Sequence, residues 1–252
     1  MRAVILLSTV ICQLLVWDLA IKVILLFSYP AAVRFIDRRV GTWAITLFGF
    51  ARAYVGLRLK RELSSVDLPD RFILLSNHQS LADIVALMAS FPERNVRFVA
   101  KRELRRGFPA VSWVLRLQRH ALIERHGRFS ATMKEIELLG RRSRAGGWCP
   151  VIFPEGTRSR DGVVRTFHAG AVRRLAESTR FPIVAVAVDG GYNIARLSDF
   201  IGKRTVGNYR VKAMAVYPPA ASKQELREQL RDAEIRVATQ VASWQGRTIQ
   251  GR

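Results

Sequence analysis

The clearest indication of the fold is the stretch Ser76-Asn77-His78-Gln79-Ser80-Leu81-Ala82-Asp83, which is largely polar and lies between the apolar runs 72–75 and 84–88. An apolar run, then polar residues, then helical spacing is typical of a buried strand that leads through a loop into a helix. The pattern therefore predicts strand, loop and helix in that order. It places His78 at the carboxyl end of the strand.

His78 and Asp83 are the candidate catalytic residues of this stretch. On one continuous helix their side chains would point about 140° apart, so they could not meet. If Ser80 is the helix N-cap, Asp83 is the third helical residue and its carboxylate can turn back toward His78. A carboxylate on one imidazole nitrogen leaves the other free to take a proton from a hydroxyl. The alternative is a capping box between Ser80 and Asp83, with His78 as an ordinary loop residue.

A second strand-to-loop transition lies at Val151-Ile152-Phe153-Pro154-Glu155-Gly156-Thr157-Arg158-Ser159. Loops that follow parallel strands can converge at one edge of an α/β sheet, where such folds bind their ligands. Arg158 here, and Arg125 after the apolar residues 121–123, could each hold a phosphate through two parallel hydrogen bonds. Glu155 would repel a phosphate, so we expect it to orient Arg158 or another basic group from behind. Gly156 lets the backbone approach the ligand.

The two motifs together, Asn77-His78 with Asp83 and the later residues 153–159, resemble those of the glycerolipid acyltransferases that acylate lysophosphatidic acid. The resemblance runs from about Phe72 to Val188. Either motif alone is a loose pattern, but the pair in this order and spacing is specific.

Further residues between and after the motifs match the same family or depart from it. The matching positions are Lys101, Glu103, Leu104, Arg125 and Pro182. The family usually has glycines near Ser112 and Arg119 and a lysine at His168, and this chain has none of them. We therefore expect a differently shaped pocket floor and one weaker contact to a phosphate or to the donor.

The resemblance implies transfer of a fatty acyl chain from a thioester, acyl-CoA or acyl carrier protein, to the free hydroxyl of a lysophospholipid. The favoured acceptor is 1-acylglycerol-3-phosphate, which gives phosphatidic acid. His78, oriented by Asp83, would be the general base. The acceptor's phosphate would be held by Glu155, Gly156, Thr157, Arg158, Arg125 and Lys101. We expect no metal and no cofactor, because the acyl donor is itself a substrate.

Other functions stay open at this point. The acceptor could be another lysolipid, including a lyso-aminolipid without a phosphate, and a transacylase would use the same residues with a different donor. A serine hydrolase could use Ser76 or Ser80, although the chain lacks the G-x-S-x-G elbow. A basic, non-enzymatic protein that binds membranes or nucleic acid would account for the charge alone.

The chain is strongly basic, with 41 Lys+Arg against 20 Asp+Glu and a net charge of +21 over 252 residues. Such a charge implies an anionic partner, and we expect an anionic membrane surface and no nucleic acid. The two cysteines and four histidines lack the spacing typical of a disulfide framework or a metal site. They are Cys12, Cys149, His78, His120, His126 and His168.

The N-terminus predicts attachment to a membrane. Residues 3–28 are almost wholly apolar, and a second apolar stretch covers residues 43–57. Asp18 interrupts the first run near its middle, which favours a tilted span or a hairpin lying partly in the bilayer. Arg34, Arg38 and Arg39 should keep their side in the cytoplasm, so we expect the active site on the cytoplasmic face. A cleaved signal peptide is the alternative.

After this segment, apolar strand-like runs alternate with helix-like segments, which predicts an α/β fold with a single layered domain and a largely parallel sheet flanked by helices. The expected strands are residues 72–75, 96–100, 121–123, 151–153, 183–188 and 211–216. The expected helices are residues 81–90, 103–117, 129–139, 169–178 and 224–244. We divide the chain into a membrane-associated helical segment (1–57), an acyltransferase α/β domain (58–220) and a C-terminal packing helix (221–252).

Overall fold

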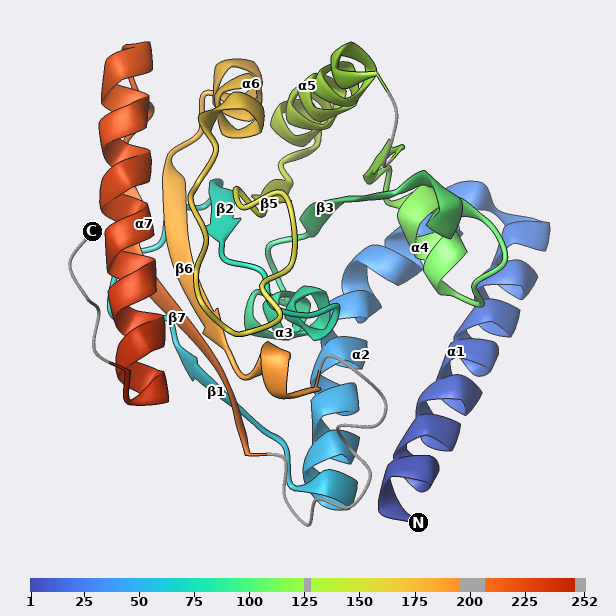
Figure 1. The fold of residues 1–252 in the computed structure, drawn as a ribbon. Coiled ribbons are helices and arrows are strands. Elements are labelled where there is room, and N and C mark those ends of the chain that lie inside the picture. The colour runs from blue at the N-terminus through green and yellow to red at the C-terminus, as the bar shows by residue number, and fades with distance from the viewer. Residues whose placement is uncertain (125–127, 195–206, 248–252) are drawn as a thin grey trace.

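The computed structural model describes residues 1–124, 128–194 and 207–247. These form a seven-stranded sheet with helices on both faces (Figure 1). The strands are β1 (Arg58–Glu62), β2 (Ile73–Ser76), β3 (Val96–Lys101), β4 (Ala121–Ile123), β5 (Cys149–Ile152), β6 (Ile183–Asp189) and β7 (Asn208–Tyr217). The helices are α1 (Arg2–Phe27), α2 (Tyr29–Val55), α3 (Ala82–Ser90), α4 (Val111–Leu117), α5 (Phe129–Gly146), α6 (Ala169–Thr179) and α7 (Lys223–Gln245), with short 3-10 helices η1 (Arg102–Arg105) and η2 (Gly191–Ile194).

The sheet has the order β1-β7-β6-β2-β5-β3-β4, and all neighbours from β6 to β4 are parallel. The predicted layered α/β fold is thus confirmed, with one antiparallel pair between β6 and β7. We did not predict β1, which pairs with β7 at the edge of the sheet. Four of the five residues of β1 are charged, so the sequence has no apolar run that predicts a strand there. Charged residues are common on edge strands.

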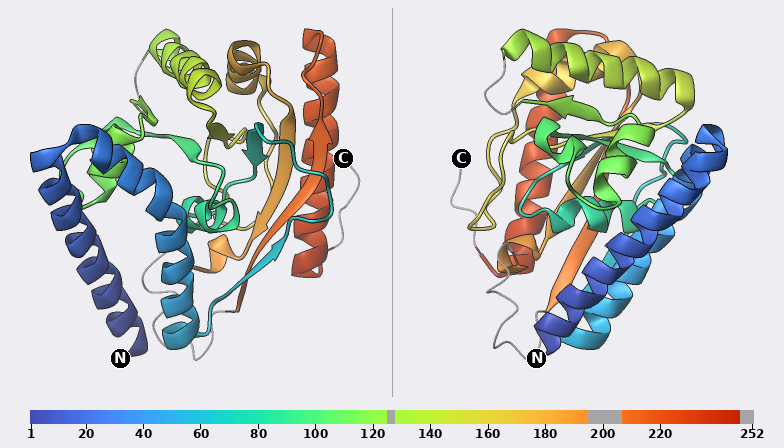
Figure 2. Two further views of the ribbon diagram at one scale, coloured as in Figure 1. Left: turned by 180° about the vertical axis from the view of Figure 1, so that it is seen from behind. Right: turned by 90° about the vertical axis from the view of Figure 1, so that its right-hand side faces the viewer.

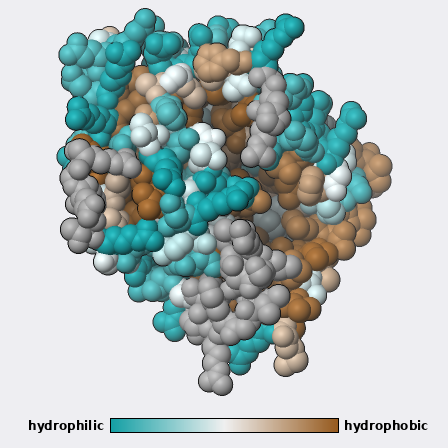
Figure 3. Space-filling view, viewed as in Figure 1, coloured by the Kyte–Doolittle hydropathy of each residue, from teal (hydrophilic) through white to brown (hydrophobic). Residues whose placement is uncertain are grey.

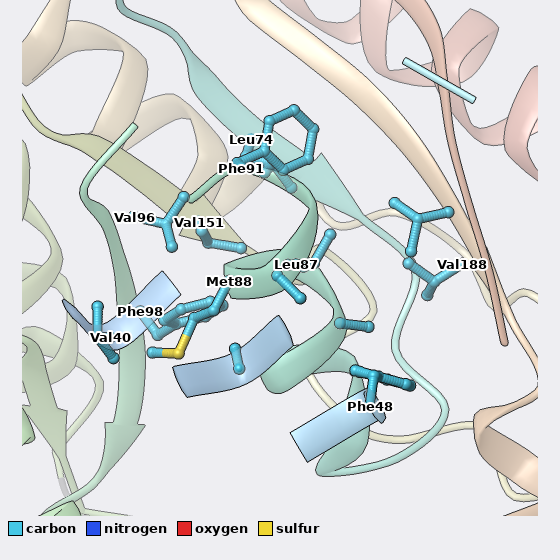
Figure 4. Packing of buried hydrophobic residues seen from close by; sticks show 14 of the residues in the cluster. Val40, Phe48, Leu74, Leu87, Met88, Phe91, Val96, Phe98, Val151 and Val188 are labelled. Carbon is cyan, nitrogen blue, oxygen red and sulfur yellow. The ribbon is translucent and has the colours of Figure 1, made fainter. Parts of the chain in front are cut away.

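Successive residues of each strand face opposite helical layers, as a pleated sheet requires. Ile73 and Leu75 pack with the core beneath α5, α6 and α7, whereas Leu74 packs with the core beneath α2 and α3. Figure 2 shows the two layers from behind and from the side. Figure 4 shows the second core, in which Phe48 of α2 and Leu87 of α3 lie on the same side of the sheet.

Helices α1 and α2 form a hairpin at the margin of the domain (Figures 1 and 2). Ser28 ends α1 and caps α2, because its side chain accepts a hydrogen bond from the Ala31 amide (3.3 Å). α1 is long and apolar enough to be a candidate membrane segment, and only Leu6 and Ile21 of it are buried. The second helix begins at Tyr29, well before the apolar stretch 43–57 that we expected, because its charged first half also packs on the domain.

An ion pair between the partly exposed Asp37 and the buried Arg97 anchors the charged half of α2. Asp37 accepts hydrogen bonds from the Arg97 guanidinium (2.7 Å) and from the Gln118 side-chain Nε2 (2.8 Å). Arg97 is fully buried on β3, and its guanidinium also lies over the Trp148 ring. α2 is therefore part of the core of the α/β domain as well as the second arm of the hairpin.

Two helix predictions need correction. α3 begins at Ala82, so Ser80 is not its N-cap and Asp83 is the second helical residue. The expected helix 103–117 is divided into η1 and α4. The segment between them contains Gly107 in a left-handed conformation (φ 84°) and Pro109, and both interrupt a helix.

Candidate functional site

The two predicted loops lie side by side at the carboxyl ends of neighbouring parallel strands. β2 leads into the loop of His78, and β5 leads into the loop of Glu155 and Arg158. The backbone joins the loops directly, because the Ser159 amide donates to the His78 carbonyl (2.7 Å). This is the edge at which α/β sheets place their ligands.

Asp83 and His78 form the pair that their spacing predicted. The His78 Nδ1 lies 2.7 Å from the Asp83 Oδ2, and the aspartate is fully buried. The same oxygen accepts from the backbone amides of Gln79 (2.6 Å) and Ser80 (2.8 Å). Asp83 thus holds the imidazole and the two backbone amides before α3, but it does not form a capping box with Ser80, because the N-cap of α3 is Leu81.

The geometry assigns the histidine tautomer. An ionised carboxylate only accepts hydrogen bonds, so Nδ1 must carry the proton that it shares with Asp83. In the described part of the chain the Nε2 atom makes no hydrogen bond, and the imidazole stacks on Phe153 with 4.0 Å between ring centroids. Nε2 is therefore the nitrogen that can accept a proton from a ligand.

Tyr209 of β7 completes the surroundings of Asp83, and the sequence did not point to it. Its hydroxyl donates to the Asp83 Oδ1 from a fully buried position. Burial and the neighbouring Asp83 carboxylate raise the pKa of Tyr209 well above its usual value of 10.0, so it stays a proton donor. A tyrosine on the buried face of a strand has a hydroxyl that needs a partner, but the sequence does not indicate which residue that partner is.

Gly191 permits this close packing. A Cβ atom at that position would lie 2.8 Å from the Tyr209 hydroxyl and 2.9 Å from the Asp83 Oδ1. Both distances are shorter than a carbon atom tolerates, so a side chain here would displace the Tyr209–Asp83 hydrogen bond.

Glu155 holds the backbone of His78. Its Oε1 accepts from the His78 amide (2.7 Å) and its Oε2 from the Arg165 amide (2.8 Å). We expected Glu155 to orient the Arg158 side chain, but its two oxygens are directed to backbone amides. Burial is the main cause that raises the pKa of Glu155 from 4.5 to about 7, the two amides oppose it, and nearby Asp83 adds to the rise.

The other predicted phosphate-binding residues lie around the same edge. Gly156, Thr157 and Arg158 are exposed in the loop after β5, and Gly156 has the left-handed φ of 68°. In the described residues Arg158 makes no ion pair, so its guanidinium is available to a ligand. Lys101 is exposed at the carboxyl end of β3, the other neighbour of β5. Arg125 lies outside the described residues.

Two further loop residues, Asn77 and Gln79, brace the site from within. The Asn77 amide group pairs with both backbone groups of Val188 on β6 (2.9 and 2.8 Å). The Gln79 side chain donates to Asp189 (3.2 Å), which also accepts from Gln245 at the end of α7 (2.6 Å). These contacts bind the histidine loop to β6 and to the C-terminal helix.

Comparison with known proteins agrees with this geometry. The family model named Acyltransferase matches residues 60–189. A 1-acyl-sn-glycerol-3-phosphate acyltransferase of Cocos nucifera is 34% identical over 48% of this chain and 38% of its own length. The human 1-acyl-sn-glycerol-3-phosphate acyltransferase beta is 34% identical over 57% of this chain and 50% of its own length. The chain spans about half the length of the curated relatives it matches.

One solved structure matches nearly the whole chain. It is the 1-acyl-sn-glycerophosphate acyltransferase PlsC of Thermotoga maritima, with 23% identity, a TM-score of 0.67 and coverage of 99% of this chain and 100% of the other. At that identity the likeness shows the fold. The family-model match covers more than half of the chain and contains both loops of the site, and the chain belongs to the Acyltransferase family.

Proposed function

We propose that the chain transfers a fatty acyl group from an acyl thioester to the free hydroxyl of 1-acylglycerol-3-phosphate, giving phosphatidic acid. The observation that carries the proposal is the His78 imidazole, which Asp83 holds at Nδ1 beside the loop of Arg158. Among the described residues Nε2 has no hydrogen-bond partner and Arg158 has no ion pair. The names of the relatives supply the acceptor class. The thioester is that of acyl-CoA or of an acyl carrier protein.

The proposed reaction needs one general base. His78 Nε2 takes the proton of the acceptor hydroxyl as its oxygen attacks the thioester carbonyl, and the buried Asp83 stabilises the imidazolium that forms. Backbone amides of the loop after β5 stabilise the oxyanion. The new C–O bond forms, the C–S bond breaks, and the departing thiolate takes the proton from His78.

The acceptor's phosphate is proposed to bind Arg158, with Lys101 and the backbone of Gly156 and Thr157 around it. A guanidinium matches a phosphate with two parallel hydrogen bonds. Glu155 acts behind this site, because its carboxylate holds the His78 amide and is buried away from the ligand. Arg125 is proposed as a further contact.

The hairpin of α1 and α2 is proposed to keep this site at a membrane, with the active site on the cytoplasmic side. α1 exposes large apolar side chains along its length, including Val16, Leu19 and Leu26. In Figure 3 the hydrophobic surface gathers on the right flank, where Figure 1 places α1. A lysophospholipid already resides in that bilayer surface.

The test is acyl transfer from a labelled acyl thioester to 1-acylglycerol-3-phosphate in membranes that carry the chain. We expect His78→Ala to lower kcat by about 10²–10⁴-fold, as for loss of a general base. Arg158→Ala should mainly raise the acceptor KM, by about 10–100-fold, since a charge-assisted hydrogen bond is worth roughly 1.5–3 kcal/mol.

Arg160→Ala is the matched control, because Arg160 is exposed in the same loop. It should change the acceptor KM little. Transfer that survives the loss of His78 would disprove the mechanism. If the chain acylates only a lyso-aminolipid and Arg158→Ala has no effect, the role of His78 as general base stands, but 1-acylglycerol-3-phosphate is not the acceptor.

A further inference from the structure

A cavity of about 430 Å³ lies between η1, α4, β4 and α5, away from the catalytic loops. Among the residues that line it are five arginines and one glutamate: Arg102, Arg105, Arg116, Arg119, Arg142 and Glu135. None of its lining residues belongs to the loops of His78 and Glu155. It is therefore a basic concavity distinct from those two loops, although Arg102 directly follows Lys101 of the proposed phosphate site.

The positive charges of this cavity are only partly compensated. Arg102 pairs with Glu124 at 2.9 Å, and the Arg116 guanidinium lies 3.9 Å from the centre of the Trp113 ring. In the described part of the chain, Arg105, Arg119 and Arg142 have no ion pair with a carboxylate. Guanidinium groups gathered around one hollow repel each other unless an anion lies between them.

The backbone of Arg119 has a conformation that is unusual for a residue with a side chain. Arg119 lies two residues after the end of α4 and has a left-handed φ of 54°. Its amide donates to the Arg116 carbonyl and the His120 amide donates to the Leu115 carbonyl (both 3.1 Å), which is the Schellman arrangement. Glycine is the favoured residue at this position, because a side chain strains the left-handed conformation.

A strained residue that keeps a long charged side chain over a cavity indicates a function for that side chain. We propose that the cavity binds a phosphate group, on a ligand other than the acylated acceptor, through Arg105, Arg116, Arg119 and Arg142. A phosphate accepts several guanidinium hydrogen bonds at once and cancels their repulsion. The phosphate is that of an anionic lipid headgroup or of a soluble phosphate compound.

The position of the cavity favours the lipid source. α4 adjoins α1 (Figure 1), and the Asp18 carboxylate of α1 accepts from the Ala110 amide just before α4 (2.9 Å). Phe108 is half exposed on the same segment. If the apolar side of α1 enters a bilayer, η1 and α4 come to the level of the headgroups.

The test compares the purified full-length chain with Arg119→Gly in two binding assays. One is flotation with phosphatidylcholine vesicles with and without phosphatidylglycerol, and the other is titration with inorganic pyrophosphate. Arg119→Gly relieves the backbone strain, so its Tm should equal or exceed that of the wild type. A loss of binding then cannot be attributed to misfolding.

We expect Arg119→Gly and Arg119→Gln to weaken binding of the anionic vesicles by about tenfold, as for the loss of one charge-assisted hydrogen bond to a phosphate. Arg106→Gln is the matched control, because Arg106 is exposed in the same segment but does not line the cavity. Weaker vesicle binding only in the Arg119 variants supports a headgroup site. Weaker pyrophosphate binding with unchanged vesicle binding supports a soluble phosphate. Equal losses in the Arg106 variant, or no loss in either assay, would overturn the proposal.

Discussion

Glu155→Gln tests whether the buried carboxylate between the two loops titrates near neutral pH. Burial raises the pKa of Glu155 from 4.5 to about 7. Between these values the folded chain therefore holds a proton on Glu155 that the unfolded chain has lost. The free energy of unfolding then falls as the pH rises through this window. The 2.5-unit difference corresponds to a change of about 3 kcal/mol.

A glutamine at position 155 cannot titrate, so the variant lacks this contribution. We expect the stability of wild type relative to Glu155→Gln to fall by about 3 kcal/mol between pH 4.5 and pH 7 and to level off above it. Urea unfolding of the detergent-solubilised chain, followed by tryptophan fluorescence at several pH values, measures the difference. Glu177→Gln, at an exposed glutamate of α6, should show no comparable trend.

Activity should respond in the opposite sense. An ionised Glu155 accepts from both the His78 and Arg165 amides, whereas a glutamine offers one oxygen and an NH₂ group that faces the second amide. The ratio of wild-type to variant acyl transfer should therefore grow as the pH rises from about 6 to 8, where the wild type ionises. If neither the stability difference nor the activity ratio changes with pH, Glu155 does not titrate near neutral pH, and its bonds to the His78 and Arg165 amides do not control activity.

Two further changes test the supports of the site and of the hairpin. Tyr209→Phe removes the hydroxyl that donates to the buried Asp83. We expect kcat to fall by about tenfold with an unchanged acceptor KM, since a hydrogen bond to a charged group is worth about 1.5–3 kcal/mol. An unchanged kcat would exclude a positioning role for Tyr209. Asp37→Ala leaves the fully buried Arg97 without its carboxylate and should lower the free energy of unfolding by about 3–5 kcal/mol. The double variant Asp37→Leu/Arg97→Met, measured by the same urea unfolding, should be destabilised less, because it leaves no buried charge.

The contact between His78 and Asp83 could be predicted from the sequence because it is local. The two residues lie on either side of one helix start, and the strand before them is a clear apolar run. The loop after β5 was equally visible, because it follows a second buried strand. Family resemblance then added the acyl transfer that neither pattern states alone.

The contact of Tyr209 with Asp83 could not be predicted in this way, because it joins residues 126 positions apart. It depends on the insertion of β7 antiparallel to β6, and no apolar pattern specifies that order. The direction of the Glu155 carboxylate was also hidden. It depends on the path of the loop, including the left-handed turn at Gly156, and the residue types alone do not determine that path.

These distant contacts extend the proposed catalytic site beyond the segment that the family model matches, which ends at residue 189. Tyr209 orients Asp83 from β7, and Gln245 at the end of α7 holds Asp189 and through it Gln79. An ionised carboxylate has about four acceptor sites, and within the described residues Asp83 accepts from four donors, which fix its orientation. A histidine that acts as a base needs such a fixed partner. If the carboxylate could rotate, the hydrogen bond that keeps the proton on Nδ1 would be lost, and Nε2 would no longer be held unprotonated. We therefore expect β7 and α7, which follow the matched segment, to support the proposed catalytic site as well as the core.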